Sequence, residues 1–368
     1  MSTAFDFAIV GAGISGAAVA ARLAAHGRVL LIERELQPGM HSTGRSAAMF
    51  MESYGSPQGR ALTRASRAAY LAPAVVPILS PRGSLYVGWR GQEREFDANA
   101  NEGVVQLDAA ATLARLPVLQ PQGLLGSWYE EDAMDIDVHA LLQSQLAAAR
   151  GHGAVLWAGA EVMHAARREG RWHVALTDGR SASAEVLVNA AGAWADVVAQ
   201  AAGAAPLGLQ PKRRSAFTFD APEGHDHRRW PVAGGVDERW YFKPDAGQLI
   251  GSPANADPVP PHDVLPEALD IASGIAAIEE ATTLRIRRPR RTWAGLRTFA
   301  PDGEMVIGFD AAAPGFFWHA GQGGWGIQSA AGAALLAEAL ILKSTWPAAL
   351  AREGVDADAL NPARLRGA

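Results

Sequence analysis

Three glycines near the N-terminus have the spacing of a phosphate-binding turn. Gly11, Gly13 and Gly16 follow an apolar run, and a second apolar run over residues 29–32 ends in Glu33. In a βαβ unit the first glycine permits a tight turn, the second lets the backbone approach a pyrophosphate, and the third lets the helix pack against the strand. The helix N-terminus attracts phosphate, and the acidic residue pairs with a ribose 2′-hydroxyl. The pattern therefore predicts a bound dinucleotide, either FAD or NAD.

Later strand signals indicate that this nucleotide-binding unit is interrupted along the chain. A buried strand over 186–189 leads into a glycine, and strands at 306–307 and 316–319 precede a glycine cluster and a long Ala/Leu helix over 326–342. The stretch 206–292 is rich in proline, aromatic and β-branched residues, which favours a separate antiparallel sheet. NAD dehydrogenases usually complete their Rossmann domain in one block, whereas FAD enzymes of the two-dinucleotide-binding type often do not.

The predicted fold class is α/β with α+β character. It combines a Rossmann FAD domain of the two-dinucleotide-binding type with a mainly antiparallel β substrate domain. We expect a discontinuous FAD-binding domain over 1–80, 137–205 and 296–368, and a substrate-binding domain over 81–136 and 206–295.

Composition and charge exclude several classes of protein. The 368 residues carry a formal net charge of −5, which does not favour binding to nucleic acid or to an anionic membrane. The sequence has no cysteine, so disulfides, cysteine–zinc sites, thiol catalysis and a flavin tethered through a cysteine sulfur are excluded. No apolar stretch reaches the ~20 residues that span a bilayer. We therefore expect a cytoplasmic protein without stable membrane insertion.

Two polar segments could suggest other kinds of site. The basic run 285–291 is expected to be a strand with a solvated basic face rather than an RNA-binding patch. His225 and His227 lack a third candidate ligand, so no metal site is expected there.

Several longer segments resemble one family of flavoenzymes. They cover residues 41–48, 189–194, 211–217, 251–257, 293–308 and 321–328. Together they resemble the D-amino-acid oxidase and sarcosine/glycine oxidase family of FAD enzymes, and within it the bacterial FAD-dependent D-arginine dehydrogenases. The resemblance runs along nearly the whole chain and implies a non-covalently bound FAD.

The resemblance also implies which residues hold the cofactor. Ser15, Glu33 and Arg34 would lie at the pyrophosphate and adenosine. The segment 41–46 would wrap the pyrophosphate and flavin. The backbone of Val162 would bond the adenine side. The full expected set is Gly11, Gly13, Ser15, Gly16, Glu33, Arg34, His41, Ser42, Thr43, Gly44, Arg45, Ser46, Ala48, Val162, Ala191, Gly192, Trp194, Gly295, Arg297, Gly323, Gly324, Trp325, Gly326, Ile327 and Gln328.

For the substrate, the resemblance implies a carboxylate clamp made by two arginines. A guanidinium suits this task because it can bind both carboxylate oxygens at once, although arginines without such a resemblance more often form surface ion pairs. The expected catalytic residues are Tyr54, Arg214, Tyr241 and Arg297. The expected substrate-binding residues are these four together with Met49, Ser84, Gly324 and Gln328.

Two positions depart from the D-arginine dehydrogenase pattern. Met49 replaces a histidine, and Ser84 replaces a glutamate that holds a basic substrate side chain. Because an unpaired buried cation is costly, D-Arg and D-Lys are expected to be poor substrates. Met49 and Phe50 favour a more apolar pocket.

We therefore expect oxidation of a D-amino acid that is not strongly basic to its imino acid, then hydrolysis to a 2-oxo acid and ammonia. The alternatives are oxidation of a secondary amine, of glycine or an imino acid, or of a 2-hydroxy acid. An NAD-linked dehydrogenase and a non-enzymatic or RNA-associated flavoprotein are further alternatives. The electron acceptor, oxygen or a quinone-type molecule, is left open.

Overall fold

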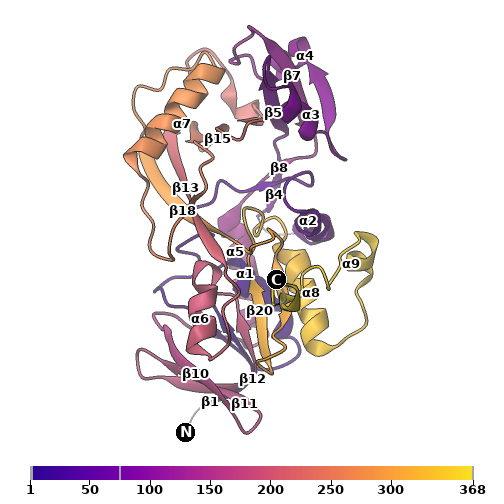
Figure 1. The fold of residues 1–368 in the computed structure, drawn as a ribbon, viewed down its shortest axis with the longest axis vertical. Coiled ribbons are helices and arrows are strands. Elements are labelled where there is room, and N and C mark those ends of the chain that lie inside the picture. The colour runs from indigo at the N-terminus through magenta and orange to yellow at the C-terminus, as the bar shows by residue number, and fades with distance from the viewer. Residues whose placement is uncertain (1–2, 74–75, 367–368) are drawn as a thin grey trace.

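The computed structural model describes residues 3–73 and 76–366, and its first sheet is mainly parallel. At its centre β1 (Thr3–Val10) lies between β2 (Val29–Ile32) and β12 (Ser181–Asn189), and the three strands run parallel. Five more strands extend the sheet on both sides: β9 (Val155–Trp157), β10 (Val162–Arg168), β11 (Arg171–Leu176), β19 (Val306–Phe309) and β20 (Phe316–Ala320). This sheet lies in the lower part of Figure 1.

This first sheet separates two apolar cores. In β1, Phe7 and Ile9 face one core while Ala8 and Val10 face the other, as the two-residue period of a strand requires. The first core is covered by α1 (Ile14–Leu23), α2 (Pro57–Tyr70), α5 (Val138–Gly151) and α8 (Ala330–Leu342), and the second by α6 (Ala195–Ala201). The sheet is therefore covered by helices on both faces, which is typical of parallel sheets.

The second sheet is mainly antiparallel and lies in the upper part of Figure 1. Its strands in spatial order are β17 (Asp257–Pro258), β13 (Gln210–Phe219), β16 (Gln248–Ser252), β15 (Tyr241–Asp245), β14 (Val232–Gly235), β5 (Ser84–Trp89), β7 (Leu124–Glu130) and β6 (Val105–Asp108), with β18 (Arg291–Phe299) along β13. One face packs a third core with α7 (Ala268–Ala281), while α3 (Glu93–Ala98) and α4 (Ala109–Arg115) lie beside β5 and β7.

Two features connect the sheets. The long ribbon of β13 and β18 is paired from Gln210 opposite Phe299 to Thr218 opposite Arg291, and it extends toward the first sheet (Figure 1). A three-stranded sheet of β3 (Met49–Phe50), β8 (Met134–Ile136) and β4 (Leu79–Pro81) forms the second connection. Near the C-terminus, α9 (Ala348–Arg352) packs beside α2.

The structure confirms the predicted fold class, but it corrects two local expectations. Residues 285–290 form an irregular segment rather than a strand, because the N–H of Ile286 donates to the Glu279 carboxylate at 2.6 Å and Pro289 has no N–H to donate. The long Ala/Leu helix, α8, begins at Ala330 rather than at residue 326, since 323–329 form consecutive turns. The expected domain boundary at residue 296 lies inside β18, and the division into domains stays a prediction.

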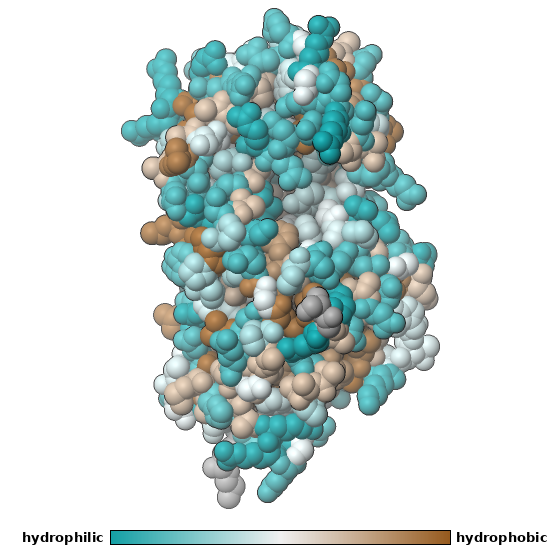
Figure 2. All heavy atoms as spheres, in the orientation of Figure 1, coloured by the Kyte–Doolittle hydropathy of each residue, from teal (hydrophilic) through white to brown (hydrophobic). Residues whose placement is uncertain are grey.

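The surface is mixed in character. On the face drawn in Figure 2, apolar residues are scattered among hydrophilic ones rather than gathered into one band. Over the part of the chain that the structure describes, every helix is too short or too polar to cross a membrane.

Candidate functional site

The turn between β1 and α1 has the geometry that its glycines predict. Gly11 has a φ of +101°, and a Cβ there would lie 2.4 Å from the carbonyl oxygen of Ala190. A Cβ at Gly16 would lie 1.9 Å from the carbonyl oxygen of Gly11. Any larger residue at either position would displace backbone, so both require glycine. Gly13 is the N-cap of α1 and places no side chain over the helix end.

Glu33 ends β2, and backbone donors hold its carboxylate in place. The N–H of Ala12 donates to Oε2 at 2.8 Å, and the N–H of Glu35 donates to Oε1 at 3.0 Å. Only 7% of Glu33 is exposed. Because each carboxylate oxygen has two lone pairs, Glu33 can still accept hydrogen bonds from ribose hydroxyls.

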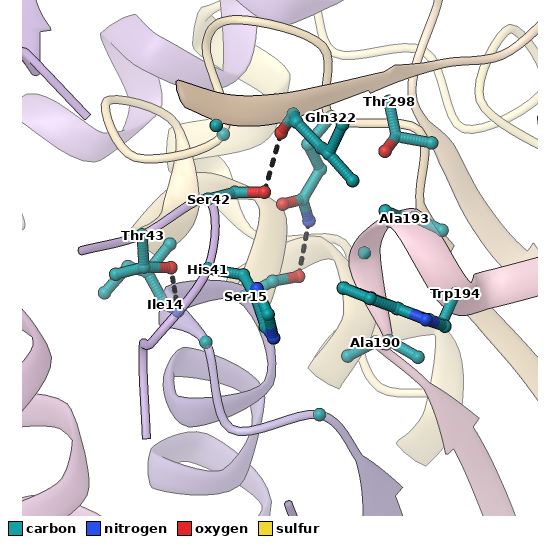
Figure 3. A pocket seen from close by; sticks show the side chains of 18 of the residues that line it. Ile14, Ser15, His41, Ser42, Thr43, Ala190, Ala193, Trp194, Thr298 and Gln322 are labelled. Atoms are coloured by element: carbon teal, nitrogen blue, oxygen red, sulfur yellow. Dashed lines mark hydrogen bonds between the residues drawn. The ribbon is translucent and has the colours of Figure 1, made fainter. Parts of the chain in front are cut away.

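Three flat side chains form a row at this end of the groove. The guanidinium of Arg34 lies 4.7 Å from the centre of the Trp194 ring, and that ring lies 4.7 Å from the His41 imidazole (Figure 3 shows the last two). His41 Nε2 lies 2.9 Å from Oε1 of Glu35, which also pairs with Arg34. This row forms a wall suited to the adenosine half of a dinucleotide.

The loop over residues 39–46 is tied to α1 and to the second sheet. Thr43 Oγ1 accepts the N–H of Ile14 at 3.1 Å, and Ser42 Oγ donates to the carbonyl of Leu296 at 2.6 Å (Figure 3). Arg45 donates to Asp263 at 2.5 Å and to backbone carbonyls, so its guanidinium holds the loop against the second sheet.

Most of the expected cofactor residues line one groove. The groove is lined by Gly11, Gly13, Ser15, Glu33, Arg34, His41, Ser42, Thr43, Arg45, Ser46, Val162, Ala191, Gly192, Trp194, Gly295, Arg297, Gly323, Gly324, Gly326 and Ile327. The groove lining does not include Gly16, Gly44, Ala48, Trp325 or Gln328. Gly16 and Gly44 instead pack against the backbone at Gly11 and Gly39.

Gln328 and Trp325 have structural contacts. The Gln328 amide accepts the N–H of Met51 and donates to the carbonyls of Met51 and Tyr54 and to Thr63. Gln328 therefore fixes the segment that carries Tyr54. The Trp325 ring packs at 5.9 Å from the Tyr54 ring and at 5.7 Å from that of Phe299.

His319 is a groove residue that stands just before the glycine cluster at 321–326. It lies in β20, one residue before the strand ends, and is 1% exposed, and neither ring nitrogen has a hydrogen-bond partner among the described residues. Burial lowers its pKa to about 4, so the ring is neutral at physiological pH. Orphaned polar atoms of this kind, the open helix end at Gly13 and the Glu33 carboxylate all fit a bound dinucleotide.

A second cavity adjoins the groove, and the second sheet forms one wall. In β15 the alternation turns Tyr241 and Lys243 toward the cavity while Phe242 packs in the third core. In β5, Ser84 and Tyr86 line the cavity, and Leu85 between them borders both the cavity and the third core. Six residues line both spaces and mark where cofactor and substrate would meet: Ser46, Ala47, Arg214, Tyr241, Arg297 and Gly324.

The two predicted clamp arginines converge on this shared wall. Arg214 Nε donates to the carbonyl of Asn255 at 2.5 Å, and Arg297 Nη1 donates to the Tyr54 hydroxyl at 3.1 Å. In residues 3–73 and 76–366, neither guanidinium forms an ion pair with a carboxylate, whereas neighbouring Arg213 pairs with three. Burial and the charge of Arg297 lower the pKa of Arg214 to about 10. Two half-buried cations without a carboxylate partner form a site for an anionic ligand.

The end of the second cavity away from the groove is more polar than Met49 and Phe50 suggest. Phe50 is fully buried in the first core, so it does not make the pocket apolar. Met49 does line the cavity, but the ammonium of Lys243 lies 3.9 Å from its sulfur and 2.6 Å from Asp135 Oδ1. The expectation of an apolar pocket is therefore wrong at this end. The period-two pattern places Lys243 on the same face of β15 as Tyr241, but it does not show what surrounds the ammonium.

Two further polar side chains line the second cavity, those of Tyr86 and Glu238. Burial, reinforced by the neighbouring Tyr54 phenol, raises the pKa of Tyr86 well above its ordinary value, so its hydroxyl is neutral and can donate. Glu238 lines the cavity but is exposed. Within the described residues, no group of three or more His, Cys, Asp or Glu side chains is arranged to hold a metal ion.

Comparison with known proteins identifies the family. The family described as "FAD dependent oxidoreductase" matches residues 6–339. The chain is 24% identical to the hydrogen cyanide synthase subunit HcnC of Pseudomonas aeruginosa, with 94% of each chain covered.

Solved structures show the same fold. Glycine oxidase from Geobacillus kaustophilus is similar with a TM-score of 0.81 at 22% identity, covering 94% of this chain and 96% of that one. Iminodiacetate oxidase from Chelativorans sp. BNC1 is similar with a TM-score of 0.77 at 21% identity, covering 94% and 98%. The groove and these matches agree that the chain belongs to the family of FAD dependent oxidoreductases and that FAD is its cofactor.

Proposed function

We propose that this chain oxidises the Cα–N bond of a D-amino acid whose side chain is not strongly basic. The product is an imino acid, which water converts to a 2-oxo acid and ammonia. The observation that carries the proposal is the pair Arg214 and Arg297, which face the wall shared by the two cavities without a carboxylate partner among the described residues. The names of the related glycine and iminodiacetate oxidases also support oxidation of an amine.

In this proposal the protein mainly binds and orients the substrate. The two guanidinium groups hold the α-carboxylate, and the Tyr54 and Tyr241 hydroxyls can donate further hydrogen bonds to it. FAD, when bound, supplies the acceptor for the electrons that leave the Cα–H bond. Fixing Cα against the cofactor provides most of the rate advantage, because orientation replaces a bimolecular encounter. Since Met49 cannot take a proton, we assign no side-chain base at that position.

The proposal excludes strongly basic substrates for an electrostatic reason. Ser84 cannot pair with a substrate cation, and its buried hydroxyl has no hydrogen-bond partner among the described residues. Lys243 would repel a second cation at the same end of the cavity. The resemblance to D-arginine dehydrogenases therefore does not extend to this specificity.

Anaerobic reduction of the flavin tests the reaction and the enantiomer. Purified holoenzyme is mixed with D- and L-amino acids, glycine, N-methylglycine and 2-hydroxy acids, and air is then admitted. We expect D-amino acids with neutral or acidic side chains to bleach the flavin. Bleaching only by 2-hydroxy acids, or only by L-amino acids, would replace the proposal with that class. The rate at which air restores the colour tells an oxidase from a dehydrogenase.

The pKa of Arg214 gives the carboxylate site a defined pH dependence. Arg214 is a cation below pH 10 and loses its charge as the pH rises through about 10, so carboxylate affinity is present at low pH and lost at high pH. We expect propionate, which has no amine to titrate, to bind at least threefold more weakly at about pH 10.5 than at about pH 8. The measurement is a titration of the flavin absorbance change. A constant affinity over this interval would contradict the role of Arg214.

A further inference from the structure

We infer that the preferred substrate carries a second carboxylate, which Lys243 binds at the end of the cavity away from the flavin. This inference rests on the proposed function of the same site. It names the substrate class as α-amino dicarboxylates, of which D-glutamate and D-aspartate are the simplest members.

The strand register places Lys243 at the far end. Val232 of β14 lies beside Ser84 of β5, and the pairing of Ala233 with Phe242 sets Val232 next to Lys243. These three residues form one row across the sheet, and they line the substrate cavity but not the FAD groove.

Tyr241 lies two residues before Lys243 on β15, about 7 Å from it. Tyr241 belongs to the next row across the sheet, and this row reaches the wall shared by both cavities. A substrate whose α-carboxylate lies between the arginines and Tyr241 therefore extends its side chain toward Lys243.

Lys243 is not needed merely to neutralise Asp135. The Nε and Nη2 atoms of Arg82 both lie 2.6 Å from Asp135 Oδ2, so one cation already pairs with this carboxylate. Lys243 is a second cation on the other oxygen, and only 5% of it is exposed. The group of Arg82, Asp135 and Lys243 therefore carries an excess positive charge beside the cavity. A lysine ammonium has three donors, and the contact with the Met49 sulfur is a weak one, so donor capacity remains.

The charge of the whole cavity supports the same conclusion. Its lining holds three cations, Arg214, Arg297 and Lys243, and one carboxylate, the exposed Glu238. An amino acid that presents a neutral amine and one carboxylate leaves positive charge unpaired at the far end. A second carboxylate removes this excess, and each buried charge then has a partner.

The test compares binding of glutarate with binding of its neutral-tailed analogue glutaramate. Titration of the flavin absorbance in the wild-type holoenzyme is expected to show glutarate binding about 10- to 100-fold more tightly, the value of one charge-assisted hydrogen bond in a buried site. In Lys243→Met the ratio should fall below about threefold, and in Lys243→Arg, which keeps the charge, most of the preference should return. Equal affinities in the wild type, or an unchanged ratio in Lys243→Met, would overturn the inference.

Turnover provides a separate readout. We expect kcat/KM for D-glutamate to exceed that for D-glutamine by at least about tenfold in the wild type, and this difference to disappear in Lys243→Met. If neutral D-amino acids are oxidised as well as acidic ones, the inference fails while the proposed function stands. If no amino acid reduces the flavin but the glutarate preference depends on Lys243, the proposed function fails and the anion site stands.

A folding defect in Lys243→Met can be told apart from the loss of an anion site. Asp135 keeps its pair with Arg82 in Lys243→Met, and the FAD content and Tm of each variant identify any general defect. Should Lys243→Met fail to fold, the wild-type comparison of glutarate with glutaramate alone decides.

Discussion

Replacing Arg297 with methionine should lower kcat/KM for the best amino-acid substrate by about 100-fold or more. Removing one partner of a buried hydrogen-bonded charge pair typically costs 2–5 kcal/mol, since the remaining charge loses its partner. The Tyr54 hydroxyl would also lose its 3.1 Å contact with the guanidinium. Most of the effect should fall on KM, because the carboxylate is bound in the ground state as well as in the transition state. Steady-state kinetics with equal FAD content per protein measure it.

Two variants make the result specific. Arg297→Lys keeps the charge but loses the planar fork, so we expect an intermediate loss of about tenfold. Lys212 lies opposite Arg297 in the β13–β18 register, but its ammonium lies over the Phe299 ring and lines neither cavity. Lys212→Met should therefore change kcat/KM by less than about threefold. An Arg297→Met enzyme as active as Lys212→Met would rule out the clamp.

The features that follow from local chemistry were predictable from the sequence. The turn at Gly11 and Gly16 requires residues without a Cβ, and the apolar run before Glu33 requires a buried strand, so their roles follow from neighbours along the chain. The interrupted order of elements also predicted two sheets, which the structure contains. The position of a strand within a sheet depends on distant partners, however. The ribbon of β13 and β18 joins residues about 80 positions apart, and the expected boundary at residue 296 divides it.

Side chains whose roles depend on several distant segments were not predictable. The surroundings of Lys243 come from Met49 on β3, Asp135 on β8 and Ser84 on β5, and no spacing in the sequence links them. Along the sequence, Met49 and Phe50 suggested an apolar pocket, because nothing near them indicates Lys243 or Asp135. His319 follows the same rule, because its burial depends on how β20 packs beside β12. The binding of the cofactor was therefore easier to predict than the choice of substrate.

Glu33→Ala should weaken FAD binding by about 100-fold. The substitution removes the acceptor for the ribose hydroxyls and also leaves the N–H groups of Ala12 and Glu35 without their partners at 2.8 and 3.0 Å. Each unsatisfied buried donor costs ~1–3 kcal/mol, so the glycine turn loses support as well as the ligand. The Kd is measured by quenching of FAD fluorescence on titration with apoprotein.

The contribution of ribose binding can be separated from that of the turn. A loss of ribose contacts raises the Kd for FAD but leaves the Tm of the apoprotein unchanged. A weakened turn instead lowers the Tm of the apoprotein and of the holoenzyme alike. Glu185→Ala is the matched control, because Glu185 is exposed on β12 and pairs with Arg171 away from the groove. It should change the FAD Kd by less than about twofold. If Glu33→Ala bound FAD as tightly as Glu185→Ala, the acidic residue at the end of β2 would have no part in holding the dinucleotide. Recognition would then depend on the turn and on the row of Arg34, Trp194 and His41.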